Sequence, residues 1–162
     1  MAAITPPFGT ADAAGWNPTG AATLHEAVDD PIASTDGDTS YAACTDGTAC
    51  ELELPAMDHP NQLDGLVLRV SSRKAVDTSQ TCTLRVELFC GATLIASTEF
   101  DEGASYATTE LTLSESEAEA ITDYGNLTVV VTDVASPLTA EHRVSSVELE
   151  IPDRILRAHV SG

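Results

Sequence analysis

Short runs of alternating apolar and polar residues, separated by turn residues, dominate this chain. Every second residue of the run 82–90 is apolar or cysteine, and the same two-residue period recurs in the runs 66–70 and 147–151. Strands have this period because successive side chains point to opposite faces of a sheet. The pattern therefore predicts strands with one face toward a core and the other toward solvent.

We predict nine such strands and one helix. The strands cover residues 22–28, 39–44, 50–54, 63–72, 81–89, 93–100, 107–113, 127–132 and 143–151. The helix should cover about 115–123, because Ser114 and Glu117 have the spacing of a capping box, with Ala118 and Ile121 facing inward. These elements predict an all-β fold, a two-sheet antiparallel β-sandwich of the jelly-roll kind with one short crossing helix.

The chain divides into three regions by composition. Residues 1–20 are rich in Ala, Gly, Thr and Pro and predict an extended N-terminal arm, and residues 21–152 form the predicted sandwich domain. Residues 153–162 place Arg154, Arg157 and several apolar residues on an otherwise acidic chain. This tail is either a last strand or frayed end, or a docking peptide for an acidic partner surface.

The charge balance excludes several classes of function. Asp and Glu number 26 against seven Lys and Arg, which leaves a net charge of -19 on 162 residues. Without a row of cations to neutralise phosphates, we expect no nucleic-acid binding. The absence of a long apolar stretch and of a signal segment predicts a soluble protein without membrane contact or export. The acidity fits either a high-salt cytoplasm, where salt screens the repulsion, or an ordinary acidic protein from a GC-rich genome.

The four cysteines leave two interpretations open. Cys82 and Cys90 are eight residues apart on one predicted strand, about 26 Å, which is beyond the reach of a disulfide. Cys44 and Cys50 flank a turn sequence and either form a disulfide across it or remain buried thiols. The scattered histidines do not have the spacing of a zinc site.

An acidic segment could hold calcium, because this ion prefers oxygen ligands. Its members are Asp29, Asp30, Asp36 and Asp38. They lack the spacing of a known calcium loop, so a solvated acidic turn is the competing interpretation. We expect no other cofactor.

Catalytic motifs are missing from the sequence. It contains no nucleophile elbow, phosphate-binding glycine loop or His-Glu-x-x-His motif, and we therefore predict that the protein is not an enzyme. The rings available for stacking on sugars are few, and we considered Trp16, Tyr41, Tyr106 and Tyr124.

Four features of the region 16–152 carry a resemblance to a known family: Trp16, the acidic segments 24–31 and 36–41, the helix and strand over 113–129, and the closing strand over 143–152. By these features the region resembles small jelly-roll virion proteins of tailed viruses. Two features depart from that family: Cys44 and Cys50, which flank residues 46–47, and the tail after residue 152. The resemblance implies a structural role in a virion, and together with the acidity it favours a virus of a halophilic archaeon.

Two functions follow from these expectations. The first is a capsid decoration or cement protein, assembled in the host cytoplasm, that binds the major capsid protein or other virion proteins as a homo-oligomer. Its expected partner-binding residues are Trp16, Arg154, Ile155, Leu156, Arg157 and Val160. The alternative is a turret, collar or tail-associated module that binds host-surface glycans.

Overall fold

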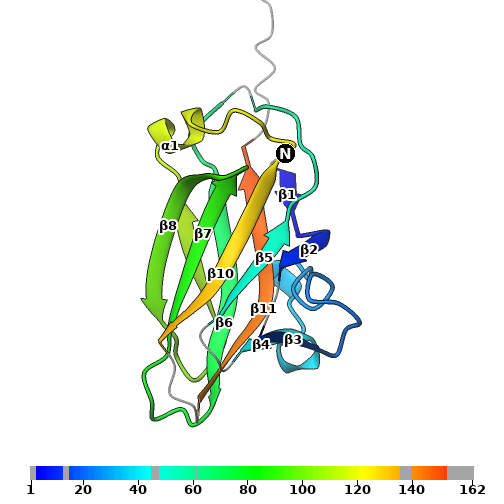
Figure 1. Cartoon of the computed structure of the whole chain (residues 1–162), viewed down its shortest axis with the longest axis vertical. Helices are drawn as coiled ribbons and strands as arrows, with labels where there is room; N and C mark the ends of the chain where they lie inside the picture. Colours follow the sequence, from blue (N-terminus) through cyan, green and yellow to red (C-terminus); the bar gives the residue numbers. More distant parts are fainter. Residues whose placement is uncertain (1–2, 13–14, 45–47, 61, 136–139, 153–162) are drawn as a thin grey trace, which may run out of the picture.

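The computed structural model describes residues 3–12, 15–44, 48–60, 62–135 and 140–152, which form a two-sheet antiparallel jelly-roll β-sandwich (Figure 1). The first sheet contains, in order, β3 (Trp16–Thr19), β4 (Tyr41–Cys44), β11 (Ala140–Ile151), β6 (Val67–Val76) and β9 (Ala107–Thr112), with β1 (Ala3–Thr5) paired to the end of β11. The second sheet contains, in order, β2 (Gly9–Asp12), β5 (Ala49–Glu53), β10 (Leu127–Ala135), β7 (Thr83–Cys90) and β8 (Thr93–Asp101). The predicted fold class is confirmed.

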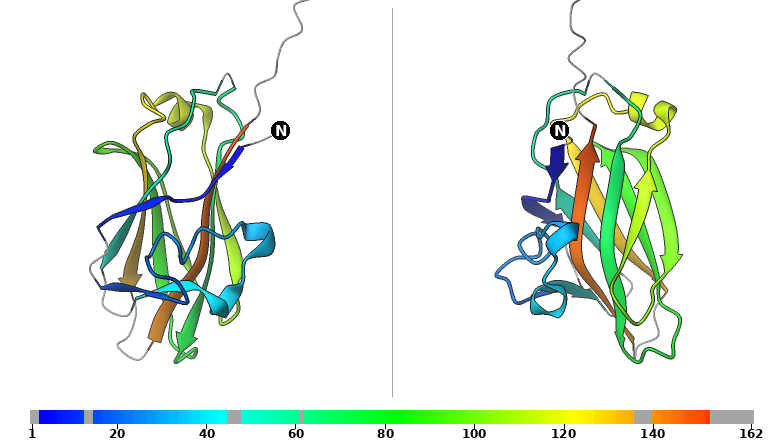
Figure 2. Two further views of the ribbon diagram at one scale, coloured as in Figure 1. Left: turned by 90° about the vertical axis from the view of Figure 1, so that its right-hand side faces the viewer. Right: turned by 180° about the vertical axis from the view of Figure 1, so that it is seen from behind.

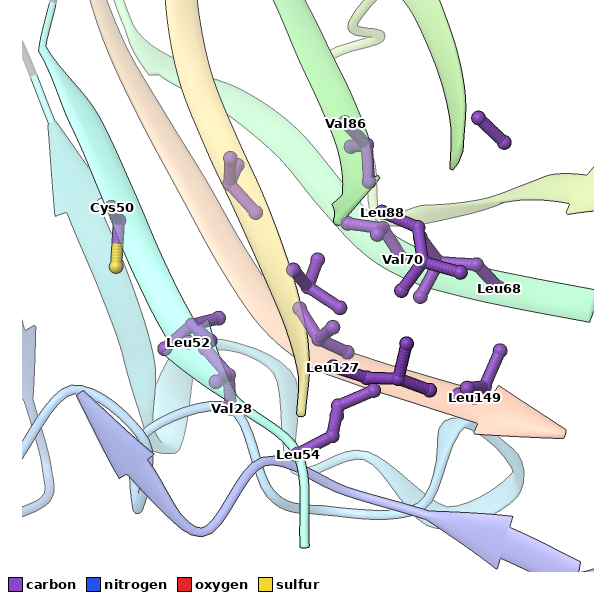
Figure 3. Packing of buried hydrophobic residues seen from close by; sticks show 14 of the residues in the cluster. Val28, Cys50, Leu52, Leu54, Leu68, Val70, Val86, Leu88, Leu127 and Leu149 are labelled. Carbon is purple, nitrogen blue, oxygen red and sulfur yellow. The ribbon is translucent and has the colours of Figure 1, made fainter. Parts of the chain in front are cut away.

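The alternating residues form the core between the two sheets. On β7 the buried positions are Leu84, Val86, Leu88 and Cys90, and each of their neighbours is more exposed. Figure 3 shows Leu88 beside Leu68 and Val70 of the opposite sheet. Burial of such apolar side chains from both inner faces drives the two sheets together.

Eight of the nine predicted strands are confirmed as β4 to β11. The ninth, over residues 22–28, is wrong, because this segment forms turns instead. Its Thr23 and Glu26 side chains bond each other's backbone N–H groups at 3.4 and 3.0 Å, and this local pairing competes with a sheet ladder. Leu24 and Val28 still reach the core from these turns.

The N-terminal segment differs from the expected arm. Its described residues supply β1, β2 and β3, which pair with β11, β5 and β4. Strand pairing uses backbone groups and so needs few apolar side chains. β2 and β3 are the outermost strands at one side of each sheet, and they pair with the edges of β5 and β4 that would otherwise be unpaired. The tail over 153–162 lies outside the described residues, and its docking role stays a prediction.

The predicted capping box is present at the start of α1 (Glu115–Glu119). The Ser114 hydroxyl accepts from the Glu117 N–H at 3.3 Å, and the Glu117 carboxylate accepts from the Ser114 N–H at 2.7 Å. The helix ends earlier than predicted, but Ala118 and Ile121 are buried as expected. Within the described part of the chain, no helix has the length and apolar character needed to cross a membrane.

Replacing Gly20 by Ala should destabilise the fold by about 2–3 kcal/mol. Gly20 has φ +76°, and a Cβ there would lie 1.8 Å from the Thr39 carbonyl oxygen, so the backbone would have to move. Gly103→Ala is the matched control, because its Cβ would meet only the Ser105 carbonyl oxygen at 3.9 Å. Chemical denaturation measures both changes, and equal stability of the two variants would contradict the prediction.

Candidate functional site

A groove lies on the outer face of the second sheet. It has a volume of about 380 Å³ and follows β10, with β5 on one side and β7 on the other. Its lining comes from these three strands and from the turn after β7: Ala49, Glu51, Arg85, Glu87, Phe89, Gly91, Ala92, Thr128, Val130 and Thr132.

The sheet register explains why the groove forms. The outward side chains of β10 are the short Thr128, Val130 and Thr132, whereas Val130 pairs with Glu51 on β5 and Glu87 on β7. Adjacent strands are about 4.8 Å apart, so the two carboxylate side chains stand on either side of a low floor. A central strand of short residues between strands with longer ones therefore produces a depression along the sheet.

An aromatic ring marks one end of the groove. Phe89 pairs with Thr128 on β10 and with Leu94 on β8, and its side chain is half-buried. The turn that follows carries the small residues Gly91 and Ala92, and Gly91 adopts φ +58° as the tight hairpin requires. This end of the groove is therefore apolar.

The other end of the groove is charged. The Arg85 guanidinium donates to Glu87 at 3.2 Å and to Glu99 on β8 at 3.3 Å. Arg85 is thus held between two carboxylates and keeps a fixed position on the sheet. Together with Glu51 and Thr132, it offers both hydrogen-bond donors and acceptors to a polar ligand.

Trp16 is not on the surface as expected for a partner-binding residue. Its ring is buried in the core, with 4% of the residue exposed, and its indole N–H donates to the Thr48 carbonyl at 3.0 Å. The other expected partner-binding residues, Arg154, Ile155, Leu156, Arg157 and Val160, lie outside the described residues.

The candidate calcium ligands do not converge on one point. Asp38 binds Arg73 and Arg143 at 3.1 and 3.0 Å, and Asp36 accepts hydrogen bonds from Ser40. Asp29 is exposed, and the Asp30 carboxylate accepts a long bond of 3.4 Å from the Asp36 N–H. Among the described residues, no group of three or more His, Cys, Asp or Glu side chains is arranged to hold a metal ion.

Asp38 instead fastens the segment between β3 and β4 to the first sheet. This segment carries η1 (Ile32–Ser34) and η2 (Gly37–Thr39) and lies against β11 (Figure 2). Burial would raise the pKa of Asp38, but Arg143 and Arg73 outweigh this effect and lower it. Both guanidinium groups also lie over tyrosine rings. Arg143 is 4.5 Å from the centre of the Tyr41 ring, and Arg73 is 5.7 Å from the centre of the Tyr106 ring.

The structure holds Cys44 and Cys50 as buried thiols rather than as a disulfide. Cys44 ends a strand of the first sheet and Cys50 lies in a strand of the second, and both side chains face the core. Cys82 and Cys90 are buried thiols as well.

The aromatic residues considered for sugar binding are not those of the groove. Trp16 and Tyr124 are buried, while Tyr41 and Tyr106 belong to the cluster around Asp38. Sequence reasoning did not single out Phe89. The sequence does carry a signal for it. Phe89 lies between the inward-facing Leu88 and Cys90 in the alternating strand, and this position places its ring on the solvent face.

No family model and no curated protein sequence matches this chain. Among solved structures, the xylan-binding module CBM15 superposes with a TM-score of 0.52 at 12% identity, covering 95% of this chain and 99% of that one. A CBM4 structure gives a TM-score of 0.48 at 17% identity over 83% of this chain and 93% of the other. TmCBM61, solved with β-1,4-galactotriose, gives 0.45 at 7% identity over 91% and 86%. These three neighbours are carbohydrate-binding modules, and the likeness to CBM15 shows the jelly-roll β-sandwich fold.

Replacing Asp38 by Asn should cost about 1 kcal/mol of stability, because Arg73 and Arg143 lose a shared counter-charge at a partly exposed site. The loss should shrink at 1 M salt, which screens this exposed interaction. Asp29→Asn removes the same charge from an exposed neighbour in the same segment and should change stability by less than about 0.5 kcal/mol. Denaturation at low and high salt measures the difference, and an equal effect of the two variants would contradict the role of Asp38.

Proposed function

We propose that this chain is a glycan-binding module and that the groove along β10 holds the sugar. The observation that carries the proposal is the composition of this groove. One aromatic ring stands at an end of a depression of about 380 Å³, and charged side chains that can hydrogen-bond stand along its sides. Most ligand sites combine an apolar surface with a few polar groups in this way.

The two ends of the groove match the two kinds of surface on a sugar. A pyranose ring has a face of C–H groups that packs on an aromatic ring such as Phe89. Its hydroxyl groups both donate and accept hydrogen bonds, and they can donate to Glu51 and Glu87 and accept from Arg85. A hydroxyl-rich chain lying along β10 would meet both kinds of contact.

The rigidity of the site also favours binding. All three lining strands lie within one antiparallel sheet, and Arg85 is already held by Glu87 and Glu99. A ligand would therefore order few side chains when it binds, which lowers the entropic cost. A xylan-binding module with the same fold is consistent with this use of a β-sandwich. We expect no catalysis at this site, and that expectation stays a prediction.

Replacing Phe89 by Ala should weaken glycan binding about tenfold or more, equivalent to ~1.4 kcal/mol, because the stacking surface is lost. Titration calorimetry with xylo-, cello- and galacto-oligosaccharides, preceded by retention on insoluble polysaccharides, measures the change. Phe8→Ala is the matched control, since Phe8 is 58% exposed and does not line the groove. Failure of the wild-type protein to bind any of these glycans would overturn the proposal, and unchanged binding by Phe89→Ala would remove the groove as the site.

The role of a capsid decoration protein, with a homo-oligomer in a virion of a halophilic host, stays a prediction. Of its expected attachment residues, Trp16 is buried, and the others lie in the segment 153–162, outside the described residues. It predicts that deleting 153–162 abolishes binding to capsids while the unfolding transition stays unchanged. Co-sedimentation with capsids measures this, and wild-type occupancy by the shortened protein would contradict it.

A further inference from the structure

A histidine is enclosed in the core between two carboxylates. His142 lies on β11, and its side chain and those of Glu102 and Asp133 are all 0% exposed. Its Nδ1 is 2.5 Å from Glu102 Oε2, and its Nε2 is 2.8 Å from Asp133 Oδ1. Both ring nitrogens thus face carboxylate oxygens.

The three residues connect the two sheets. His142 belongs to the first sheet, Asp133 lies on β10 of the second, and Glu102 directly follows β8 of the second. The apolar contacts of the core are non-directional, whereas these two short hydrogen bonds link particular positions of the facing sheets.

The geometry requires a proton at this place. Two carboxylates can both be bonded by one imidazole only if the ring is an imidazolium that donates twice, or if one carboxyl is itself protonated and donates to a neutral ring. In either arrangement the group of three holds one proton more than a neutral histidine beside two ionised carboxylates. The proton belongs to the coupled group rather than to one residue.

The surroundings favour retention of this proton. Burial alone would lower the pKa of His142, but the hydrogen bonds and charges of Glu102 and Asp133 outweigh burial and raise it. Burial raises the pKa of Glu102, and His142 only partly offsets this effect. Both shifts mean that the folded protein binds the proton more tightly than the unfolded chain does.

Three other ionisable groups lie near this cluster: Cys82, Lys74 and Asp77. Cys82, just before β7, is bonded through its carbonyl to the Glu102 N–H at 2.9 Å, and burial raises the pKa of its thiol. Lys74 on β6 donates to the Gln80 carbonyl at 2.7 Å, and Asp77 lies in the turn that follows β6. A pH window between about 6.5 and 8 lies above the ordinary pKa of histidine and below that of cysteine, and it is the window in which the proton of the cluster is tested.

We propose that His142 is a proton-held clamp: one proton, shared with Glu102 and Asp133, joins the two sheets, and the folded state loses stability when mildly alkaline pH removes it. The clamp does not depend on the glycan groove. Its contribution to stability is greatest below about pH 6.5 and decreases as pH rises above that value.

The sign of the effect follows from the direction of the shifts. An unfolded histidine loses its proton near pH 6.5, and the folded cluster keeps its proton above that pH. Between these two points the folded state binds one proton more, so stability falls as pH rises. The unfolding equilibrium constant should therefore increase by up to about tenfold per pH unit from pH 6.5 to 8.

Chemical denaturation of the full chain at pH 6.5, 7, 7.5 and 8 tests the clamp. The unfolding equilibrium constant of the wild type should rise from pH 6.5 to 8, and that of Glu102→Gln should rise much less. The amide keeps the shape of the Glu102 side chain but provides no negative charge to hold the proton. Glu99→Gln is the matched control, since it removes the same charge at the exposed pair with Arg85 and should keep the wild-type slope.

Nuclear magnetic resonance of the wild-type His142 ring provides a second measurement if Glu102→Gln does not fold. The ring should remain bonded at both nitrogens at pH 7 and change state only at higher pH. A ring that titrates at or below pH 6.5 would overturn the proposal. So would a wild-type unfolding constant that is flat across the window, or a Glu102→Gln variant with the wild-type slope.

Discussion

The two-residue period of the strands is the constraint on which the rest of this molecule depends, and β10 shows it most clearly. Val129, Val131 and Asp133 point into the sandwich, while Val130 and Thr132 form the floor of the groove outside. A slip of one residue in the pairing would exchange these two faces. The register of β10 with β5 and β7 therefore sets the core and the groove together.

The net charge of -19 leaves only seven Lys and Arg side chains to pair with 26 Asp and Glu. Arg69, Arg73 and Arg143 all lie on the outer face of the first sheet, and each is bound by at least one carboxylate. There the cations serve the fold. Arg73 on β6 and Arg143 on β11 bind Asp38 of the segment after β3. Arg69 on β6 binds carboxylates of the neighbouring strands β9 and β11. On the second sheet Arg85 is bound as well, but it also lines the groove. The two outer faces thus differ: the arginines of the first bind the chain's own carboxylates, and Arg85 on the second also lines an open groove.

Alternation and capping were sufficient to predict eight strands, the helix start and the fold class, because these signals lie within a few residues. The edge strands β1 to β3 escaped prediction because they are held by backbone pairing, which the side-chain pattern does not record. The groove requires Glu51, Glu87 and Val130 to share a row, and such long-range register is not visible in one sequence. His142 looked like one of four scattered histidines, since its carboxylate partners are 40 and nine positions away.

The groove and the clamp meet on adjacent residues of β10. Thr132 lines the groove, and the next residue, Asp133, turns inward to His142. The pairing of β10 with β7 shifts register just after this point, between Asp133 and Ala135. The bond from Asp133 to His142 adds a link to the opposite sheet at this shift. The buried proton therefore helps to define the charged end of the groove, although no ligand would touch it.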